Sequence, residues 1–153
     1  MNKRTKKLLA LLEESQIDAM LVVNPSNRQY LSNFTGSAGV LYISKNRQIL
    51  LTDFRYIEQA RGQCPDYTII NHQNKGLLPL MKEYMIEEKV KNLAIESESI
   101  TYAQYQGYKE IFGDIKIQGT IEMVEGLRKI KDENEIDYLK KAEAIGDMAF
   151  THI

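Results

Sequence analysis

Residues 24–39 read NPSNRQYLSNFTGSAG, and they directly follow the continuous apolar run AMLVV at 19–23. Asn24 and Pro25 are turn residues that end this apolar run, and Ser26 can cap a short helix after them. A loop of small residues around the single aromatic Phe34 comes next. The stretch therefore predicts a buried strand, a short helix and a loop that contacts another surface.

The block LLTDFRYIEQA at 50–60 repeats this arrangement. An apolar strand ends at Thr52, and Asp53 is a natural N-cap for a helix that opens with Phe54, Arg55 and Tyr56. Both stretches thus place a helix start at the end of a strand. In open α/β sheets, ligands usually bind at this edge.

The rest of the chain alternates strand and helix patterns. Lys45 and Asn46 separate two strand-like runs and predict a tight hairpin, because Asn tolerates a positive φ. The pattern predicts an α/β fold with a mixed sheet of about five or six strands, one hairpin and flanking helices. The expected strands are 19–23, 39–44, 47–52, 67–71, 93–95 and 115–118, and the expected helices are 4–15, 54–62, 77–89 and one that begins after Thr101.

The character of the sequence changes at Ile121. Residues 121–131 mix charges of both signs with isolated apolar residues, and they are typical of a connector. Asp132 with Glu135 forms an acidic variant of the capping box, and a helical apolar stripe follows to the end. We therefore expect one α/β domain over 1–120, and a connector with the start of a linker helix over 121–153, leading toward a further domain.

Composition narrows the class of protein. The chain has 153 residues, of which 43% are hydrophobic and 27% charged, and its net charge is −1. This balance predicts a globular protein without a broad electrostatic grip on nucleic acid. No apolar run reaches the length of about 18 residues that a membrane span needs. The single cysteine, Cys64, fits a reducing compartment, so we expect a cytoplasmic protein.

The sequence offers no constellation for metal binding or nucleophilic catalysis. Its two histidines, His72 and His152, are far apart, and Cys64 has no histidine near it in sequence. The acidic piece Glu96-Ser97-Glu98 is interpreted as solvated surface, because a hard-cation site needs about six converging oxygens. We expect neither catalytic nor metal-ligating residues in this chain.

The motifs resemble a known family. The order N-P-x-N-x-x-Y-L-x-x-F-T-G-S, then L-L-T-D-x-R-Y-x-E-Q-A, is similar to the N-terminal domain of Xaa-Pro aminopeptidases and prolidases, the creatinase/aminopeptidase P family. The tail RKIKDENEIDYLKKA at 128–142 resembles the helix that leads into the catalytic "pita-bread" domain of that family. The resemblance covers essentially the whole chain and implies a ribonuclease H-like fold.

The same resemblance implies a function for the parent protein. Family members hydrolyse the Xaa-Pro bond of peptides with a pair of divalent metal ions (Mn, Co or Zn) held in the catalytic domain. Those ligands lie beyond the match, so none is carried onto a residue here. The implied partners are the protein's own catalytic domain, a peptide substrate and a second copy in a homo-oligomer such as a dimer. This domain would supply interdomain contacts, oligomer contacts and part of the cleft wall.

Two short segments are candidates for the substrate cleft or an interface. Arg55 has a planar fork that suits a carboxylate, although the alternative is that Asp53 caps a helix and pairs with Arg55 at the surface. Phe34 could help cap a neighbouring active site, although the alternative is an ordinary loop with this ring in its own core. The full set of candidates is Phe34, Thr35, Gly36, Ser37, Asp53, Arg55 and Tyr56.

Two other functions stay open on the sequence. A catalytically inactive relative with the same fold would be a peptide- or protein-binding module. An open α/β domain could instead bind a small ligand at its strand ends, near Asn24 and Asp53.

Overall fold

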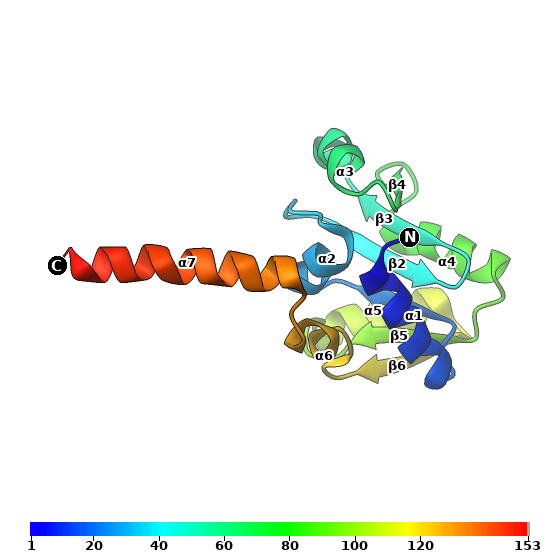
Figure 1. The fold of residues 1–153 in the computed structure, drawn as a ribbon. Helices are drawn as coiled ribbons and strands as arrows, with labels where there is room; N and C mark the ends of the chain where they lie inside the picture. The colour runs from blue at the N-terminus through cyan, green and yellow to red at the C-terminus, as the bar shows by residue number, and fades with distance from the viewer. Residues whose placement is uncertain (153) are drawn as a thin grey trace.

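The computed structural model describes residues 1–152, and within them the chain forms a six-stranded sheet with helices on both faces (Figure 1). The strand order is β4-β3-β2-β1-β5-β6. Strand β2 pairs antiparallel with both β1 and β3, whereas β1–β5, β5–β6 and β3–β4 are parallel. The predicted mixed α/β sheet with one hairpin is therefore confirmed. The strands are β1 (Ala19–Val22), β2 (Val40–Ser44), β3 (Gln48–Thr52), β4 (Thr68–Asn71), β5 (Asn92–Glu96) and β6 (Lys116–Thr120).

The sheet separates two apolar cores. Alternate strand residues point to opposite faces, so Met20 and Val22 enter one core while Leu21 and Tyr42 enter the other. The central strand β1 is buried on both faces, which explains its unbroken apolar sequence. Helices α1 (Lys3–Glu14), α2 (Pro25–Ser32), α3 (Ile57–Gln63) and α6 (Met123–Lys129) contribute to the first core, and α4 (Leu77–Glu87) and α5 (Tyr102–Phe112) to the second.

Polar caps set where the helices start at the sheet edge. Asn24, and not Ser26 as expected, caps α2, because its Oδ1 accepts from the backbone N–H of Ser26 at 3.0 Å and of Asn27 at 3.2 Å. Pro25 occupies the first helical position, so the cap lies at Asn24, two residues before the expected one. Asp53 caps the short 3₁₀ helix η1 (Phe54–Tyr56), as predicted.

The predicted connector contains a helix of its own. Val124 of α6 is fully buried, and α6 packs against α1 and α2. Helix α7 (Glu133–Thr151) then begins with the predicted Asp132–Glu135 capping box and projects from the body, with none of its residues buried (Figure 1). Within residues 1–152, none of the helices combines the length and apolar character that crossing a bilayer requires.

Candidate functional site

The structure brings the two predicted segments together beside the start of β2. The ring of Phe34 meets the ring of Tyr56 edge-on, with centroids 5.9 Å apart and planes at 88°. The hydroxyls of Ser37 and Tyr56 lie 2.6 Å apart and form a hydrogen bond. The loop after α2 and the helix start after β3 thus form one surface, although about 20 residues separate them in sequence.

Gly36 makes this contact possible. A Cβ at this position would lie 2.3 Å from Cζ of Phe34 and 2.8 Å from Cδ1 of Tyr56. Phe34 itself is 1% exposed and packs in the core of this domain. Among residues 34–37, the outward-facing ones are therefore Thr35 and Ser37.

Thr35 ties the loop to α3. Its backbone N–H donates to Oε1 of Gln63 at 3.0 Å. Its hydroxyl accepts from Nε2 of Gln59 and from Nε2 of Gln63, both at 2.9 Å. These bonds are at the surface, and they hold the loop against α3.

Asp53 and Arg55 pair with each other through three hydrogen bonds. Oδ1 of Asp53 accepts from the backbone N–H and from Nε of Arg55, each at 3.0 Å, and Oδ2 accepts from Nη2 at 2.8 Å. These hydrogen bonds lower the pKa of Asp53 and raise that of Arg55. Because the Arg55 side chain is 59% exposed, it also presents a cation at the surface, 5.3 Å above the Tyr56 ring.

Arg28 lies under the loop and was missed by the sequence reasoning. Its side chain is 3% exposed, and Nη1 and Nη2 donate to the backbone carbonyls of Gly39 and Gly36. Burial lowers the pKa of Arg28, partly offset by attraction to Glu96. Charged residues are seldom fully buried unless paired, so the sequence gives little signal for this role.

A second buried polar cluster lies at the carboxyl end of β5. Glu96 was expected at the surface, and that expectation was wrong, since the residue is 5% exposed. Its Oε2 accepts from the backbone N–H of Val23 at 2.6 Å and of Asn24 at 2.7 Å, and its Oε1 accepts from Nδ2 of Asn27 at 2.7 Å. Burial raises the pKa of Glu96, although these hydrogen bonds oppose the shift.

Asn27 carries this cluster to α6. Its Nδ2 also donates to Glu125, and its Oδ1 accepts from Nη1 of Arg128 at 2.9 Å. Asn27 is fully buried, and both amide hydrogens and the carbonyl oxygen are therefore engaged. The only sequence signal for this cluster was the motif spacing itself.

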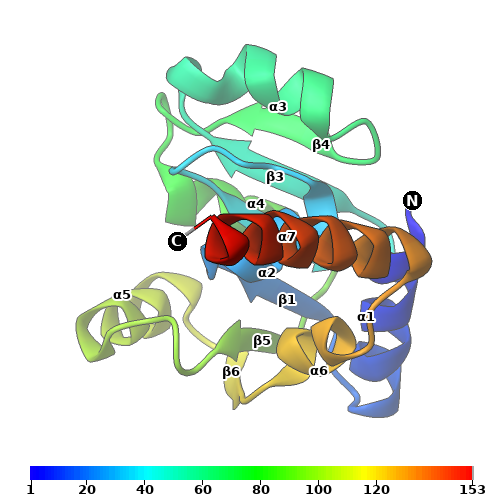
Figure 2. The ribbon, with the colours of Figure 1, turned by 60° about the vertical axis from the view of Figure 1, so that its left-hand side comes forward.

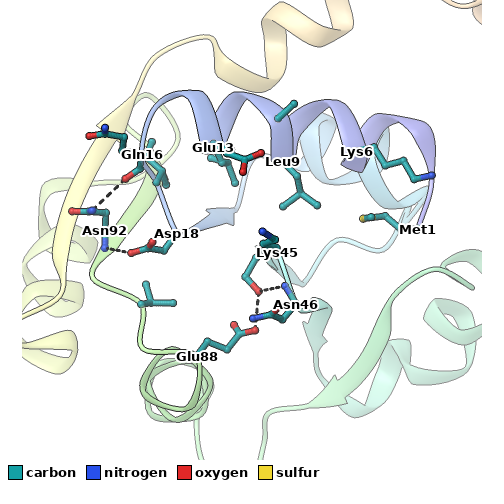
Figure 3. A pocket seen from close by; sticks show the side chains of 15 residues that line it. Met1, Lys6, Leu9, Glu13, Gln16, Asp18, Lys45, Asn46, Glu88 and Asn92 are labelled. Atoms are coloured by element: carbon teal, nitrogen blue, oxygen red, sulfur yellow. Dashed lines mark hydrogen bonds between the residues drawn. The ribbon is translucent and has the colours of Figure 1, made fainter.

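A groove of about 750 Å³ lies at the opposite end of β1, between α1 and the β2–β3 hairpin (Figure 3). The carboxylate of Asp18 in its wall already accepts from the backbone N–H groups of Lys91 and Asn92, both at 2.8 Å. Glu88 likewise accepts from Tyr42 and Ser44. Neither Asn24 nor Asp53 lines this groove, so it does not correspond to the ligand site considered at those strand ends.

The loop of the candidate site and the base of α7 lie on the same side of the body (Figures 1 and 2). Across residues 1–152, no three His, Cys, Asp or Glu side chains gather in a way that could hold a metal ion. The site is therefore a polar and aromatic surface of the body, formed by the loop after α2 and the helix start after β3.

Comparisons with known proteins agree with one another. The family model described as "Creatinase/Prolidase N-terminal domain" matches residues 4–130. The chain is 37% identical over 150 residues to the uncharacterized peptidase YqhT of Bacillus subtilis, covering 98% of this chain and 42% of that protein.

Solved structures give the same picture. An Xaa-Pro dipeptidase from Bacillus anthracis matches with a TM-score of 0.91 at 39% identity, over 98% of this chain and 42% of that one. The N-terminal domain of the cytoplasmic peptidase PepQ from Mycobacterium tuberculosis matches with a TM-score of 0.75 at 30% identity, over 83% of this chain and 99% of that domain. The chain thus spans 42% of the length of the first two relatives.

Proposed function

Since this chain belongs to the creatinase/prolidase N-terminal domain family, as its motifs predicted, we propose that it is the non-catalytic N-terminal domain of a metal-dependent, proline-specific peptidase. The whole protein would hydrolyse the Xaa-Pro bond of peptides as a dipeptidase or aminopeptidase. The observation that carries the proposal is the coverage: nearly the whole chain matches relatives of which it spans only 42%. The catalytic residues of the whole protein would lie in the remaining part.

The metal ions that the family implies do not fit the part of this chain that the structure describes, because its acidic and histidine side chains do not converge. A pair of divalent ions (Mn, Co or Zn) would therefore be held by the C-terminal part. We derive no catalytic step from residues 1–152.

The loop and the helix start at Asp53 would contribute to the substrate cleft or to an interface. Ser37 and Tyr56 are hydrogen-bonded and Arg55 lies over the Tyr56 ring, so the loop and the helix start present one continuous surface, which supports this role. Arg55 could recognise a peptide carboxylate only by exchanging part of its pairing with Asp53. A homo-oligomer, such as a dimer, and a cytoplasmic location complete the proposal; the second is supported by the relative described as a cytoplasmic peptidase.

An activity assay tests the proposal. We expect no turnover of Xaa-Pro peptides by the 153-residue chain in the presence of Mn²⁺, and turnover by the whole protein. Robust turnover by the chain alone would contradict a non-catalytic role. Peptide binding by the whole protein without turnover would favour a binding module instead.

The site is tested in the whole protein by Arg55→Ala, with Arg61→Ala as the matched control. Arg61 is also an exposed arginine paired with a nearby carboxylate, that of Glu58. If Arg55 contributes to the cleft, its removal raises KM for Xaa-Pro peptides roughly tenfold, since a charge-assisted hydrogen bond contributes on this order. Equal effects of the two variants would remove Arg55 from the proposed cleft.

A further inference from the structure

Helix α6 connects the folded body to α7. The position and orientation of α6 therefore decide the direction in which α7 leaves the domain. The only apolar side chain of α6 that is fully buried is that of Val124, within the part of the chain that the structure describes. Met123 and Leu127 are half-buried against the same core, so the apolar contacts of this seven-residue helix are few. The polar contacts of α6 add directional constraints to this packing.

Asn27 provides the first of these contacts. Its amide group bridges two carboxylates, Glu96 of β5 and Glu125 of α6, and its carbonyl oxygen accepts from Arg128. Glu125 and Arg128 are three residues apart and so lie on one face of α6. An asparagine can make this bridge because it offers both donors and an acceptor, whereas aspartate would place a third carboxylate there.

Tyr30 provides a second contact one helical turn along α2. Its hydroxyl donates to the carbonyl of Leu127 at 3.2 Å. Its own carbonyl accepts from Nη1 of Arg4 at 2.9 Å, and Nη2 of Arg4 pairs with Asp132 at 2.9 Å and with Glu135 at 3.0 Å. Asp132 and Glu135 form the capping box of α7, so this contact reaches the base of the projecting helix.

The end of β1, which supports both contacts, is itself held in place by hydrogen bonds. Glu96 accepts from the backbone N–H groups of Val23 and Asn24, at the point where β1 becomes α2. The central sheet is therefore linked through Glu96 and Asn27 to α6 and onward to α7. Such a chain of buried and part-buried hydrogen bonds adds direction to the apolar contacts of Met123, Val124 and Leu127.

We propose that Asn27 is a positioning residue that, together with Tyr30, holds α6 in one orientation and so fixes the direction in which α7 leaves the domain. This gives the N-x-x-Y part of the motif a physical role. The functional consequence of this inference rests on the proposed function. A fixed α7 would hold the C-terminal part in a constant position relative to the loop at Thr35 and Ser37. Its test needs no peptidase activity, so the two proposals fail separately.

The test measures the direction of α7 in this chain. Spin labels are placed at Asp114→Cys, in the turn before β6, and at Lys140→Cys on α7, in a Cys64→Ala background. Pulsed electron–electron double resonance then measures the distance between the label on the body and the label on α7. Hydrogen exchange of the α6 amides is measured in parallel, with the β1 amides as the reference for global opening.

The informative variants act on α6 and leave Asn27 and Glu96 in place. Glu125→Ala and Arg128→Ala each remove one arm of the bridge, whereas Glu125→Gln keeps the accepting oxygen. Lys129→Ala is the matched control, since Lys129 pairs only with Glu122 of the same segment among the described residues.

We expect one narrow distance for the parent, Glu125→Gln and Lys129→Ala. In Glu125→Ala and Arg128→Ala the distribution should broaden, and the α6 amides should exchange roughly tenfold faster while β1 is unchanged. An unchanged narrow distance in the Glu125→Ala/Arg128→Ala double variant would overturn the proposal. Equally faster hydrogen exchange of the β1 amides would also overturn it, because the contacts would then serve general stability and not the orientation of α6.

Discussion

Nη2 of Arg28 donates to the backbone carbonyl of Gly36, in the interior beneath the loop that leads into β2. Nη1 of the same guanidinium donates to the carbonyl of Gly39, so one buried cation holds the middle and the end of the loop. The guanidinium carbon also lies 5.4 Å from the centroid of the Phe34 ring. The exposed side chains Thr35 and Ser37 are thus displayed on a loop whose backbone is fixed from below.

Replacing Arg28 by methionine should release this loop. Methionine fills similar space but leaves two buried carbonyls without donors, and each unsatisfied group costs about 1–3 kcal/mol. We expect a lower free energy of unfolding in urea and faster hydrogen exchange at residues 35–39. Arg28→Lys, which can reach one carbonyl at a time, should lie between. Arg61→Met, at an exposed site, is the control and should leave both measurements unchanged.

Gly36 should not tolerate even a methyl group. An added Cβ would lie 2.3 Å from Phe34, which is itself fully buried and has little room to move. We expect Gly36→Ala to lower the free energy of unfolding by about 1–3 kcal/mol, the usual cost of overpacking. Gly107→Ala is a matched control in helix α5, where nothing lies within 4 Å of the new Cβ. This control should gain about 0.5–1 kcal/mol, and a loss in both variants of similar size would contradict the packing argument.

The sheet was predictable because its signal is local. The unbroken apolar runs of β1 and of the two hairpin strands follow directly from burial on both faces of the sheet. The caps at Asp53 and Asp132 were predictable for the same reason, since a cap acts within three residues. The meeting of the Phe34 and Asp53 segments was expected only from their common sheet edge.

The parts that were missed depend on long-range contacts. Helix α6 has seven residues, contains Gly126, and is held by the burial of Val124 against helices far away in sequence. Arg28 and Glu96 were missed because their partners, backbone groups and Asn27, are invisible to a pattern that expects charges at the surface. Neither Arg28 nor Glu96 is a fixed position of the quoted motifs, so motif spacing did not indicate them.

Glu96 should make stability fall as pH rises through mildly acidic values. Its pKa is raised above 4.5 in the folded state, mainly by burial, so in that window the folded protein holds a proton that the unfolded chain has lost. The contribution of Glu96 to stability is therefore largest below pH 4.5 and is lost as the pH rises through the raised pKa. The charges that face it are Arg28 on α2 and Glu125 on α6, and the charge of Glu96 also influences the titratable Tyr108 on α5.

Glu96→Gln should remove this contribution, so that the free energy of unfolding in urea changes less between pH 4.5 and 7 than in the parent. Glu98→Gln, an exposed neighbour, is the control and should keep the parent's slope. An identical slope in Glu96→Gln and the parent would show that Glu96 is not the group responsible.

Tyr67 gives the corresponding test at alkaline pH. Burial raises its pKa from 10.0 to about 12, and its hydroxyl lies 2.9 Å from that of Thr5 in the core beneath α1. Between these values the unfolded chain loses the phenolic proton while the folded protein keeps it, so stability falls as pH rises. Two units of pKa correspond to about 3 kcal/mol.

Urea unfolding of Tyr67→Phe should therefore show a loss of unfolding free energy between pH 10 and 12 that is smaller than the parent's by about this amount. The variant starts about 1 kcal/mol lower because the bond to Thr5 is gone. Tyr138→Phe, on the exposed face of α7, should follow the parent throughout, and a Tyr67→Phe curve parallel to the parent would place the alkaline loss at another tyrosine.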